Sequence, residues 1–468
     1  MKVVIIGSGL ASISAAKVAI SKGYKPLIID PNNKAPNKSK SSNYFLAKNK
    51  KYFPIKFKKN KDIPPYSYFK GGLALGWGGT ALPISNEDLK NWPIGLNDLE
   101  KYYKEILKEY DLLANNDLLE KSFNIYTKNN KTETVHLSYG IKKLLNEFSR
   151  KEEGFLKNNI LFGQSRILID KNNKEQNEPL SIDRTIDDLI KRNKIDYYAG
   201  YYLDFYQELD GKVILNLINE YGYKENISCD KVFIGAGSVS STRIYLNSHK
   251  IFSKTVKLLS TENYFLPILS LRKHLPFNKN KFPGIFIDFI DKSISNNWIH
   301  CQVSTLNSKM FNAAGINIPK FKGFQSLFKL VESFFYVVQI GLNSNDSNYY
   351  EIKLEEKGEL NFKFIEPKYT GKKRRKLSRK IFKLFLSNNL LVLTPLQFFG
   401  KNFKSYYVGG TLPLKKNPTK ILETDILGRP TNLKNVHFID SSVFPDLPST
   451  TFAFTIMANS ARITDNSL

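Results

Sequence analysis

The first thirty residues combine short apolar runs with a stretch of helical spacing. Val3–Ile6 is a continuous β-branched run, which is typical of a parallel strand buried on both faces. The segment Gly7–Ser12 follows at once, and apolar positions then recur with helical spacing over Ile13–Ser21. A second apolar run, Pro26–Ile29, ends in Asp30. The order strand, glycine turn, helix, strand and acid predicts a dinucleotide site rather than an ordinary βαβ unit.

Each residue type in this segment suits a nucleotide diphosphate. Gly7 permits a tight turn, and Gly9 lets backbone amides approach a pyrophosphate at the positive end of the helix. Ser12 is small enough for the helix to pack on its strand, and Asp30 can accept hydrogen bonds from a ribose. The motif alone does not separate FAD from NAD. The candidate contacts are Gly7, Gly9, Leu10, Ala11, Ser12 and Asp30.

Polar segments separate this unit from the elements that follow. Residues 31–65 are rich in Lys, Asn, Ser and Pro and indicate a long excursion, and residues 114–160 are mixed and polar. Lys70–Pro83 carries five glycines around Trp77, a density that indicates backbone pressed against a flat or bulky group. Helices are expected at 96–113, 138–148, 182–192 and 452–463, a hairpin at 197–219, and buried strands at 230–234 and 436–440.

From about residue 260 to residue 365 the apolar positions alternate with period two. Six runs rich in β-branched and aromatic residues predict one antiparallel sheet that forms a second domain. The runs are 264–271, 284–290, 298–304, 336–342, 349–354 and 360–364, with helical stretches at 323–333 and 377–386. We therefore expect an α/β chain with a discontinuous, Rossmann-like nucleotide domain (1–255 and 400–468) and an inserted, mostly antiparallel β-sheet substrate domain (256–399).

Composition excludes several classes of protein. The 468 residues include only two cysteines, Cys229 and Cys301, which excludes a disulfide scaffold and any multi-cysteine metal site. The chain holds no apolar run of about 20 residues, the length that a membrane-spanning helix needs. Lys17 interrupts the N-terminal apolar stretch, so we do not expect a secretory signal. No metal-ligand spacing is evident, and we expect no metal.

The charge balance is strongly basic, with 70 Lys and Arg against 43 Asp and Glu and a net charge of +27. Lysine and asparagine are abundant along the whole chain, which favours a compositional origin for this charge. Residues 372–386 form a basic amphipathic stretch with two open interpretations: a helix of the domain with lysine on its polar face, or a peripheral contact with an anionic membrane. No aromatic-plus-basic module accompanies it, so no nucleic-acid partner is expected.

Four segments resemble the glucose–methanol–choline (GMC) family of flavoprotein oxidoreductases. In family order they are GSGLAS at 7–12, GGLALGWGGTALP at 71–83, GAGSVSSTRIYL at 235–246, and the stretch from YVGGTLPL to DSSVFPDLPSTTFAFTIMANSARI at 407–463. The matching pieces make up about a quarter of the residues, but they are spread over nearly the whole length of the chain. The resemblance implies an FAD domain with an antiparallel substrate domain, and oxidation of alcohols, often on sugars, by hydride transfer to FAD.

The resemblance also implies roles for residues outside the first turn. It places Gly72, Trp77, Gly78, Gly79 and Thr80 along the isoalloxazine and ribityl groups, Leu203 at the adenine, Gly235, Ala236 and Gly237 beneath the adenosine half, Asp440 beside the ribityl–pyrophosphate, and Thr451 and Phe452 at the start of the last helix. The amide end of that helix would face the flavin C2 carbonyl and stabilise negative charge there. Gly76 stands where some members carry a flavin-linking histidine, so FAD is expected to be non-covalent.

The match fails at the catalytic positions. The family presents a His-x-x-Gly-Thr arrangement and a second His or Asn near the last helix, whereas this chain has Tyr407 and Thr451 there. A tyrosine and a threonine can orient a substrate hydroxyl or exchange a proton, and they can also simply fill the cleft. The histidines of the chain (His136, His249, His274, His300 and His437) have no motif around them.

These observations lead to one expected function and two alternatives. We expect a cytoplasmic FAD-dependent oxidoreductase, with the possibility of peripheral membrane attachment left open, that acts on a hydroxyl or carbonyl of a sugar or polyol-like substrate. Tyr407 and Thr451 are the catalytic candidates, and the electron acceptor is unknown. The alternatives are a flavin-dependent epimerase without net redox and a degenerate flavoprotein that acts as a binding scaffold.

Overall fold

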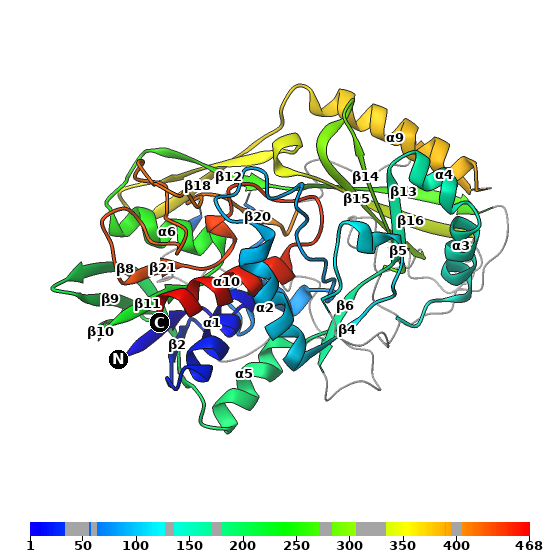
Figure 1. The fold of residues 1–468 in the computed structure, drawn as a ribbon. Coiled ribbons are helices and arrows are strands. Elements are labelled where there is room, and N and C mark those ends of the chain that lie inside the picture. The colour runs from blue at the N-terminus through cyan, green and yellow to red at the C-terminus, as the bar shows by residue number, and fades with distance from the viewer. Residues whose placement is uncertain are drawn as a thin grey trace, which may run out of the picture.

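The computed structural model describes residues 1–32, 56–57, 63–126, 135–170, 179–270, 283–305, 334–388, 390–394 and 405–468. Two groups of elements lie side by side in it: a nucleotide-type parallel sheet with its helices, and an antiparallel sheet with helices along its outer side (Figure 1). Most of the predicted excursion at 31–65 and the predicted helix at 323–333 lie outside the described residues.

A parallel sheet is built from strands far apart in the sequence. Its order is β21–β11–β1–β2–β7, and every neighbouring pair is parallel. The strands are β1 (Val3–Ile6), β2 (Leu27–Asp30), β7 (Asp196–Ala199), β11 (Lys231–Ile234) and β21 (Val436–Phe438). β1 is buried at every residue, as its β-branched run predicts. Segments from both halves of the chain therefore complete one sheet.

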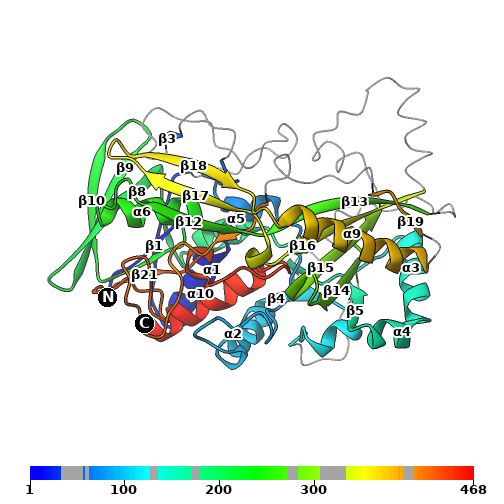
Figure 2. The ribbon, with the colours of Figure 1, turned by 90° about the horizontal axis from the view of Figure 1, so that it is seen from above.

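Helices from the two ends of the chain pack against one another beside this sheet. α1 (Leu10–Ser21) contacts α10 (Ala453–Ser467), and α10 also contacts α2 (Leu96–Glu109), as Figures 1 and 2 show. A hydrogen bond from Ser460 Oγ to the Ala11 carbonyl (2.6 Å) joins the first and last helices. α5 (Ile182–Lys191) and α6 (Ser238–Ser248) complete the helices of this part of the molecule.

An antiparallel meander crosses close to the parallel sheet. It contains β8 (Tyr201–Leu209), β9 (Lys212–Asn219) and β10 (Lys224–Cys229). The predicted hairpin is confirmed for β8 and β9, but its first residues are wrong, because 196–199 form β7 of the parallel sheet instead. Gly200 separates the two strands with φ +94°, a conformation that favours glycine.

The six predicted period-two runs all form strands, but they divide between two sheets rather than forming one. The large antiparallel sheet has the order β19–β13–β16–β15–β14–β5, and the mixed sheet has the order β20–β12–β17–β18–β3. The strands of the large sheet are β5 (Ile160–Gln164), β13 (Glu262–Ser270), β14 (Ile285–Asp291), β15 (Ser295–Thr305), β16 (Phe335–Leu342) and β19 (Leu390–Val392). Those of the mixed sheet are β3 (Lys56–Phe57), β12 (Thr255–Ser260), β17 (Tyr349–Leu354), β18 (Glu359–Ile365) and β20 (Val408–Gly409).

One predicted helix is too long at its C-terminal end. α2 ends at Glu109, and residues 110–113 form strand β4 (Tyr110–Leu113), which pairs with β6 (Ile167–Asp170). Leu112 and Leu113 are buried in this pairing. The local pattern predicts a helix because it carries no information about a partner strand more than fifty residues away.

Helices cover one face of the large antiparallel sheet. α9 (Thr370–Leu386) and α3 (Tyr139–Ser149) bury apolar side chains in the same core as that sheet, and α4 (Glu152–Lys157) lies beside them (Figure 2). Leu377, Ile381 and Phe385 are the fully buried apolar residues of α9. The opposite face of this sheet is turned toward the parallel sheet and carries the polar side chains described below. Within the described ranges, no helix is both long and apolar enough to cross a membrane.

Candidate active site

A cavity of about 1080 Å³ lies between the parallel sheet and the large antiparallel sheet. Three helices of the described chain begin at its wall: α1 at Leu10, α6 at Ser238 and α10 at Ala453. None of the three has a side-chain cap at its N-terminus. Helix N-termini carry free amides and partial positive charge, so the wall of this cavity favours a ligand with several anionic or electron-rich groups.

The turn after β1 is closed by another backbone segment. Gly7 has φ +91°, and a Cβ atom built there would lie 2.7 Å from the carbonyl oxygen of Gly235. Ser12 lies beneath the turn, where its hydroxyl donates to the carbonyls of Ile6 (3.4 Å) and Gly235 (3.3 Å). Only glycine fits at Gly7, and Ser12 links α1 to the β11 loop. At Gly9, by contrast, an added Cβ would meet no atom within 4 Å.

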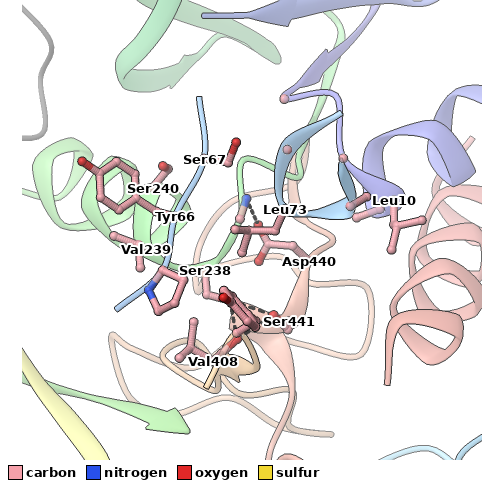
Figure 3. Close-up of a pocket in the computed structure, with 18 of the residues that line it drawn as sticks. Leu10, Tyr66, Ser67, Leu73, Ser238, Val239, Ser240, Val408, Asp440 and Ser441 are labelled. Carbon is pink, nitrogen blue, oxygen red and sulfur yellow. Dashed lines mark hydrogen bonds between the residues drawn. The ribbon is translucent and has the colours of Figure 1, made fainter. Parts of the chain in front are cut away.

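Asp440 fixes the second glycine turn. Its Oδ2 accepts hydrogen bonds from the Gly237 amide (2.9 Å) and the Ser241 hydroxyl (2.5 Å), and its Oδ1 accepts one from the Ser442 amide (2.9 Å). Figure 3 shows Asp440 beside Ser441 and the first residues of α6 at the cavity. Burial raises the pKa of Asp440, although these hydrogen bonds oppose the effect. The carboxyl group therefore ties α6 to the C-terminal segment of the cavity wall.

Asp30 closes the opposite part of the cavity at the carboxyl end of β2. It is buried, and its Oδ1 accepts a hydrogen bond from the Asn32 amide (3.0 Å). Burial raises the pKa of Asp30 to about 7, and hydrogen bonds with Ser8 and Tyr197 oppose the shift. A ligand hydroxyl that donates to this carboxylate would stabilise its charged form.

The glycine-rich segment after residue 70 lies against the first turn. The Gly71 amide donates to Ser8 Oγ (2.9 Å), and a Cβ at Gly72 would come within 3.6 Å of the Gly9 Cα. The segment continues as a short 3₁₀ helix, η1 (Gly72–Gly76), and reaches Trp77. The indole Nε1 of Trp77 is buried and has no hydrogen-bond partner among the described residues. Because an orphaned buried donor is costly, this atom is a candidate contact for a bound group.

Tyr407 lies in the cavity wall next to the start of α10. Its ring packs against Phe452 with 4.9 Å between centroids, and its backbone is held by Ser405 Oγ (3.1 Å from Tyr407 N). Burial raises the pKa of Tyr407 to about 12, and a hydrogen bond with the Thr80 side chain opposes the shift. The phenol is therefore neutral over the physiological range, and it can donate or accept a hydrogen bond there.

The large antiparallel sheet presents neutral polar side chains to the cavity. Asn263 on β13, Gln302 on β15 and Gln339 on β16 line it together with Ser405. Asn263 Nδ2 donates to Ser405 Oγ (2.9 Å), which joins the sheet to the segment that carries Tyr407. Amide and hydroxyl groups of this kind recognise hydroxyl groups by mutual hydrogen bonding.

The structure brings most of the predicted site residues to this one cavity. Those that line it are Gly7, Gly9, Leu10, Ala11, Asp30, Gly72, Trp77, Gly78, Thr80, Leu203, Gly235, Ala236, Gly237, Tyr407, Asp440 and Phe452. Ser12, Gly79 and Thr451 are not among its lining residues. Thr451 is buried and its Oγ1 donates to the Thr80 carbonyl (3.3 Å).

Several lining residues have no signal in the sequence. Asn263, Gln302 and Gln339 sit in alternating strands, where one face is polar, but the pattern does not show what that face contacts. Arg243 also lines the cavity and is buried, with Nη2 bound to Asp204 Oδ1 (2.5 Å). The pairing of β8 with β9 is irregular between Leu203 and Phe205, the stretch that contains Asp204. The described residues hold no group of three or more His, Cys, Asp or Glu that could bind a metal ion.

The residues present fit a dinucleotide such as FAD. Gly7 and Gly235 let the two turns pack closely on protein atoms, and open space lies over Gly9 and Gly78, where a bound group can approach the backbone. The Trp77 Nε1 atom has no hydrogen-bond partner among the described residues, and a bound group could accept a hydrogen bond from it. Asp30 offers a carboxylate for ribose hydroxyls, and α1 and α10 offer free amides at two places in the same cavity.

A search of solved structures finds a full-length likeness. The chain matches the crystal structure of pyridoxine 4-oxidase from Mesorbium loti over 99% of this chain and 98% of that one, with a TM-score of 0.61 and 12% sequence identity. No protein-family model matches the chain, and no curated protein matches it. At this identity the likeness shows the fold alone. The chain has the overall fold of that oxidase, which supports the GMC-like fold that the sequence resemblance predicts.

Proposed function

We propose that this protein is an FAD-dependent oxidoreductase that acts on a hydroxyl-bearing carbon of a sugar or polyol-like substrate. The observation that carries the proposal is that three uncapped helix N-termini, two open glycine positions (Gly9 and Gly78) and a polar sheet face meet at one cavity. The first two features suit a flavin dinucleotide, and the third suits a substrate with several hydroxyls. The full-length likeness to an oxidase supports the fold that this function needs.

The residues that would hold FAD follow from the cavity wall. Gly7 and Gly9 would accept the pyrophosphate at α1, Asp30 the adenosine ribose, and Trp77 and the start of α10 the flavin ring. The chemistry that FAD supplies when bound is acceptance of a hydride from the carbon that carries the hydroxyl. The α10 N-terminus would stabilise negative charge near it, because its first amides have no side-chain cap.

Tyr407 would hold the substrate oxygen without taking its proton, and the hydroxyl proton would pass to water in the cavity as the hydride leaves the carbon. Its hydroxyl lies in the cavity wall, and its pKa, raised to about 12 by burial, keeps it protonated at neutral pH. A neutral phenol orients an alcohol by hydrogen bonding but is a poor general base. Among the described residues, no histidine lines this cavity. Thr451 would act on Tyr407 only through Thr80, since its hydroxyl is directed to the Thr80 carbonyl.

The proposal is tested on purified protein. Heat should release FAD from a yellow sample, and anaerobic addition of sugars and polyols should bleach the flavin absorbance for at least one of them. A colourless protein that ignores added FAD would contradict the cofactor, and a yellow protein that no alcohol bleaches would contradict the reaction. Turnover of a sugar without any electron acceptor would instead favour the epimerase. Flavin that stays oxidised while a ligand binds would favour the scaffold.

A further inference from the structure

A hydrogen-bonded chain of three side chains runs through the large antiparallel sheet to the cavity. Asp288 on β14 and His300 on β15 face each other in register, and Asp288 Oδ1 lies 2.8 Å from His300 Nδ1. His300 Nε2 lies 3.1 Å from Gln302 Nε2, and Gln302 lines the cavity. All three side chains are on the sheet face turned away from the core that α3 and α9 cover.

The order of donors and acceptors along this chain is determined by Asp288. A carboxylate can only accept, so the proton of the imidazole must be on Nδ1 of His300. Nε2 of His300 lies against the Gln302 amide nitrogen, which can only donate, so this ring nitrogen accepts. The remaining amide oxygen, Oε1 of Gln302, is left without a role in the chain of hydrogen bonds.

The surroundings hold this arrangement rigidly. Asp288 is fully buried and His300 is 2% exposed, and the Phe286 ring packs edge-on against the imidazole at 4.9 Å. Burial lowers the pKa of the Arg166 guanidinium group, and Asp288 lies close enough to oppose this shift. A buried ionisable pair contributes little net stability, because desolvation offsets its attraction. Because the Asp288–His300 pair lies directly behind the cavity-lining Gln302, its role is better explained as holding the Gln302 amide in one orientation.

We propose that Asp288 and His300 are positioning residues that orient the Gln302 carboxamide, so that its Oε1 faces the cavity as an acceptor for a substrate hydroxyl. Gln339, directly opposite Gln302 on β16, also lines the cavity and supplies a second amide at the same level. A ligand with neighbouring hydroxyls could contact both amides. This inference rests on the proposed function for the identity of the ligand as a polyol.

The first test does not depend on catalysis. In holoprotein labelled with ¹⁵N-histidine, the His300 ring is identified as the signal absent from His300→Phe, and its tautomer is read from the nitrogen shifts. We expect a neutral ring with a protonated Nδ1 and an unprotonated Nε2. A ring protonated on Nε2 would overturn the proposal, because Gln302 would then have to present its nitrogen to the cavity.

The second test measures binding of polyols to the oxidised holoprotein by calorimetry. We expect Gln302→Met and His300→Phe each to raise the dissociation constant of a polyol roughly tenfold, the effect of one lost hydrogen bond. The double variant should be no weaker than the Gln302→Met variant. An analogue that lacks the contacted hydroxyl should bind wild type and variants alike. Gln207→Met and His249→Phe, at positions that do not line the cavity, are the matched controls.

The outcomes separate this inference from the proposed function. A polyol that binds, depends on both residues and yet never bleaches the flavin would support the inference while contradicting alcohol oxidation. A polyol that bleaches the flavin but binds the two variants with wild-type affinity would overturn the inference alone. Absence of polyol binding to wild type would overturn it as well. Flavin content and thermal midpoint of each variant show whether it is folded.

Discussion

Tyr407 stands at the position where the sequence resemblance to the GMC family predicts a histidine, and its environment determines what a tyrosine can do there. Its ring is packed against Phe452 and its hydroxyl is in contact with Thr80. Burial raises its pKa to about 12, so the phenol stays protonated at neutral pH. The side chain is therefore suited to hold an alcohol oxygen in place, and less suited to remove its proton.

A conservative substitution measures this role. Tyr407→Phe removes only the hydroxyl, and we expect kcat/KM for alcohol oxidation to fall about tenfold, the effect of one neutral hydrogen bond. The rate of anaerobic flavin bleaching by the best substrate is the measurement. A loss of about 10²- to 10⁴-fold would show instead that the phenol acts as a proton acceptor. Tyr221→Phe, at an exposed position, is the control and should leave the rate unchanged.

At the residue scale, glycine and acid positions were predictable from sequence, and neutral polar positions were not. Gly7 and Asp30 stand in a local motif whose geometry the chain itself imposes, and both line the cavity. Gln302 and Asn263 are ordinary polar residues of alternating strands. Alternation shows which residues of a strand share one face of the sheet. It does not show that this face lines a cavity, because the cavity forms only when two sheets built from distant segments pack together.

At the element scale, the N-termini of α1, α6 and α10 are the shared feature of the cavity. Gly9 is the N-cap of α1 in an extended conformation, and an added Cβ would meet no protein atom there. A methyl group at this position therefore costs the folded protein little by itself. It would occupy space next to the free amides of α1 that we propose bind the pyrophosphate.

Gly9→Ala separates folding from cofactor binding. We expect a thermal midpoint, measured after removal of flavin, within about 2 °C of the wild-type value, together with a loss of most bound FAD. Flavin absorbance per protein and the dissociation constant of added FAD are the measurements. Gly154→Ala, where a Cβ also meets nothing within 4 Å, is the matched control and should keep its FAD. Full flavin content in Gly9→Ala would show that the ligand does not approach this turn.

The basic helix α9 uses part of its charge within the molecule. Arg374 pairs with Glu262 and Glu366, and Lys380 pairs with Asp291 (2.7 Å). Its apolar side is buried against the large antiparallel sheet. The side chains of Lys372, Arg375, Lys376, Arg379 and Lys383 remain exposed. Contact with an anionic membrane stays a prediction, and these exposed cations are where it would occur.

Vesicle binding tests this contact. If α9 meets a membrane, the protein should sediment with phosphatidylserine vesicles at low salt and be released at high salt, because exposed charges are screened. Replacement of Lys372, Arg375 and Arg379 by glutamate should abolish sedimentation and leave the thermal midpoint unchanged. Glutamate at Lys191, Lys194 and Lys224, on other elements, is the charge-matched control. If binding is equally weak with neutral vesicles and is unchanged by the glutamate substitutions in α9, then α9 is a helix of the domain without a role at a membrane.

At the scale of the whole molecule, buried carboxyl groups from distant segments, Asp88, Asp288 and Asp446, lie close enough to influence one another. Asp88 is buried and accepts a hydrogen bond from Ser85 Oγ (2.9 Å). Burial raises its pKa to about 7, and the nearby Asp446 and Asp288 add to the effect. A carboxyl whose folded pKa lies above its unfolded value destabilises the folded state when it ionises, so this cost appears as pH rises from about 4 through 7.

Asp88→Asn should therefore stabilise the protein at alkaline pH. One pKa unit corresponds to about 1.4 kcal/mol, and we expect a gain on the order of 1–3 kcal/mol in the free energy of unfolding at pH 8 that is smaller at pH 5 and disappears only below about pH 4. Urea unfolding of wild type and variant at both pH values is the measurement. Histidines such as His437, whose pKa burial lowers to about 4, affect both proteins equally. An equal difference at pH 5 and pH 8 would contradict the buried ionisation.

The order of the elements along the chain was easier to predict from the sequence than the way in which those elements pair and pack. The order of strands and helices along the chain follows from periodicity, and nearly every expected element is present in the described residues. The division of the period-two strands between two sheets was not predictable, because pairing partners such as β17 with β12 and β14 with β5 are chosen by long-range packing. Local propensity describes an element but not the neighbour that it will meet.

The position of α10 has a consequence for the biosynthesis of this protein. The cavity draws its wall from Gly7 near one end of the chain and from Ile456 near the other, and β21 joins the parallel sheet only after β11. A nascent chain emerging from the ribosome therefore displays the first glycine turn long before the segment that completes the pocket exists. A complete pocket therefore exists only after the segment around Ile456 has packed beside the first glycine turn, so any ligand that needs both walls must wait for this long-range contact.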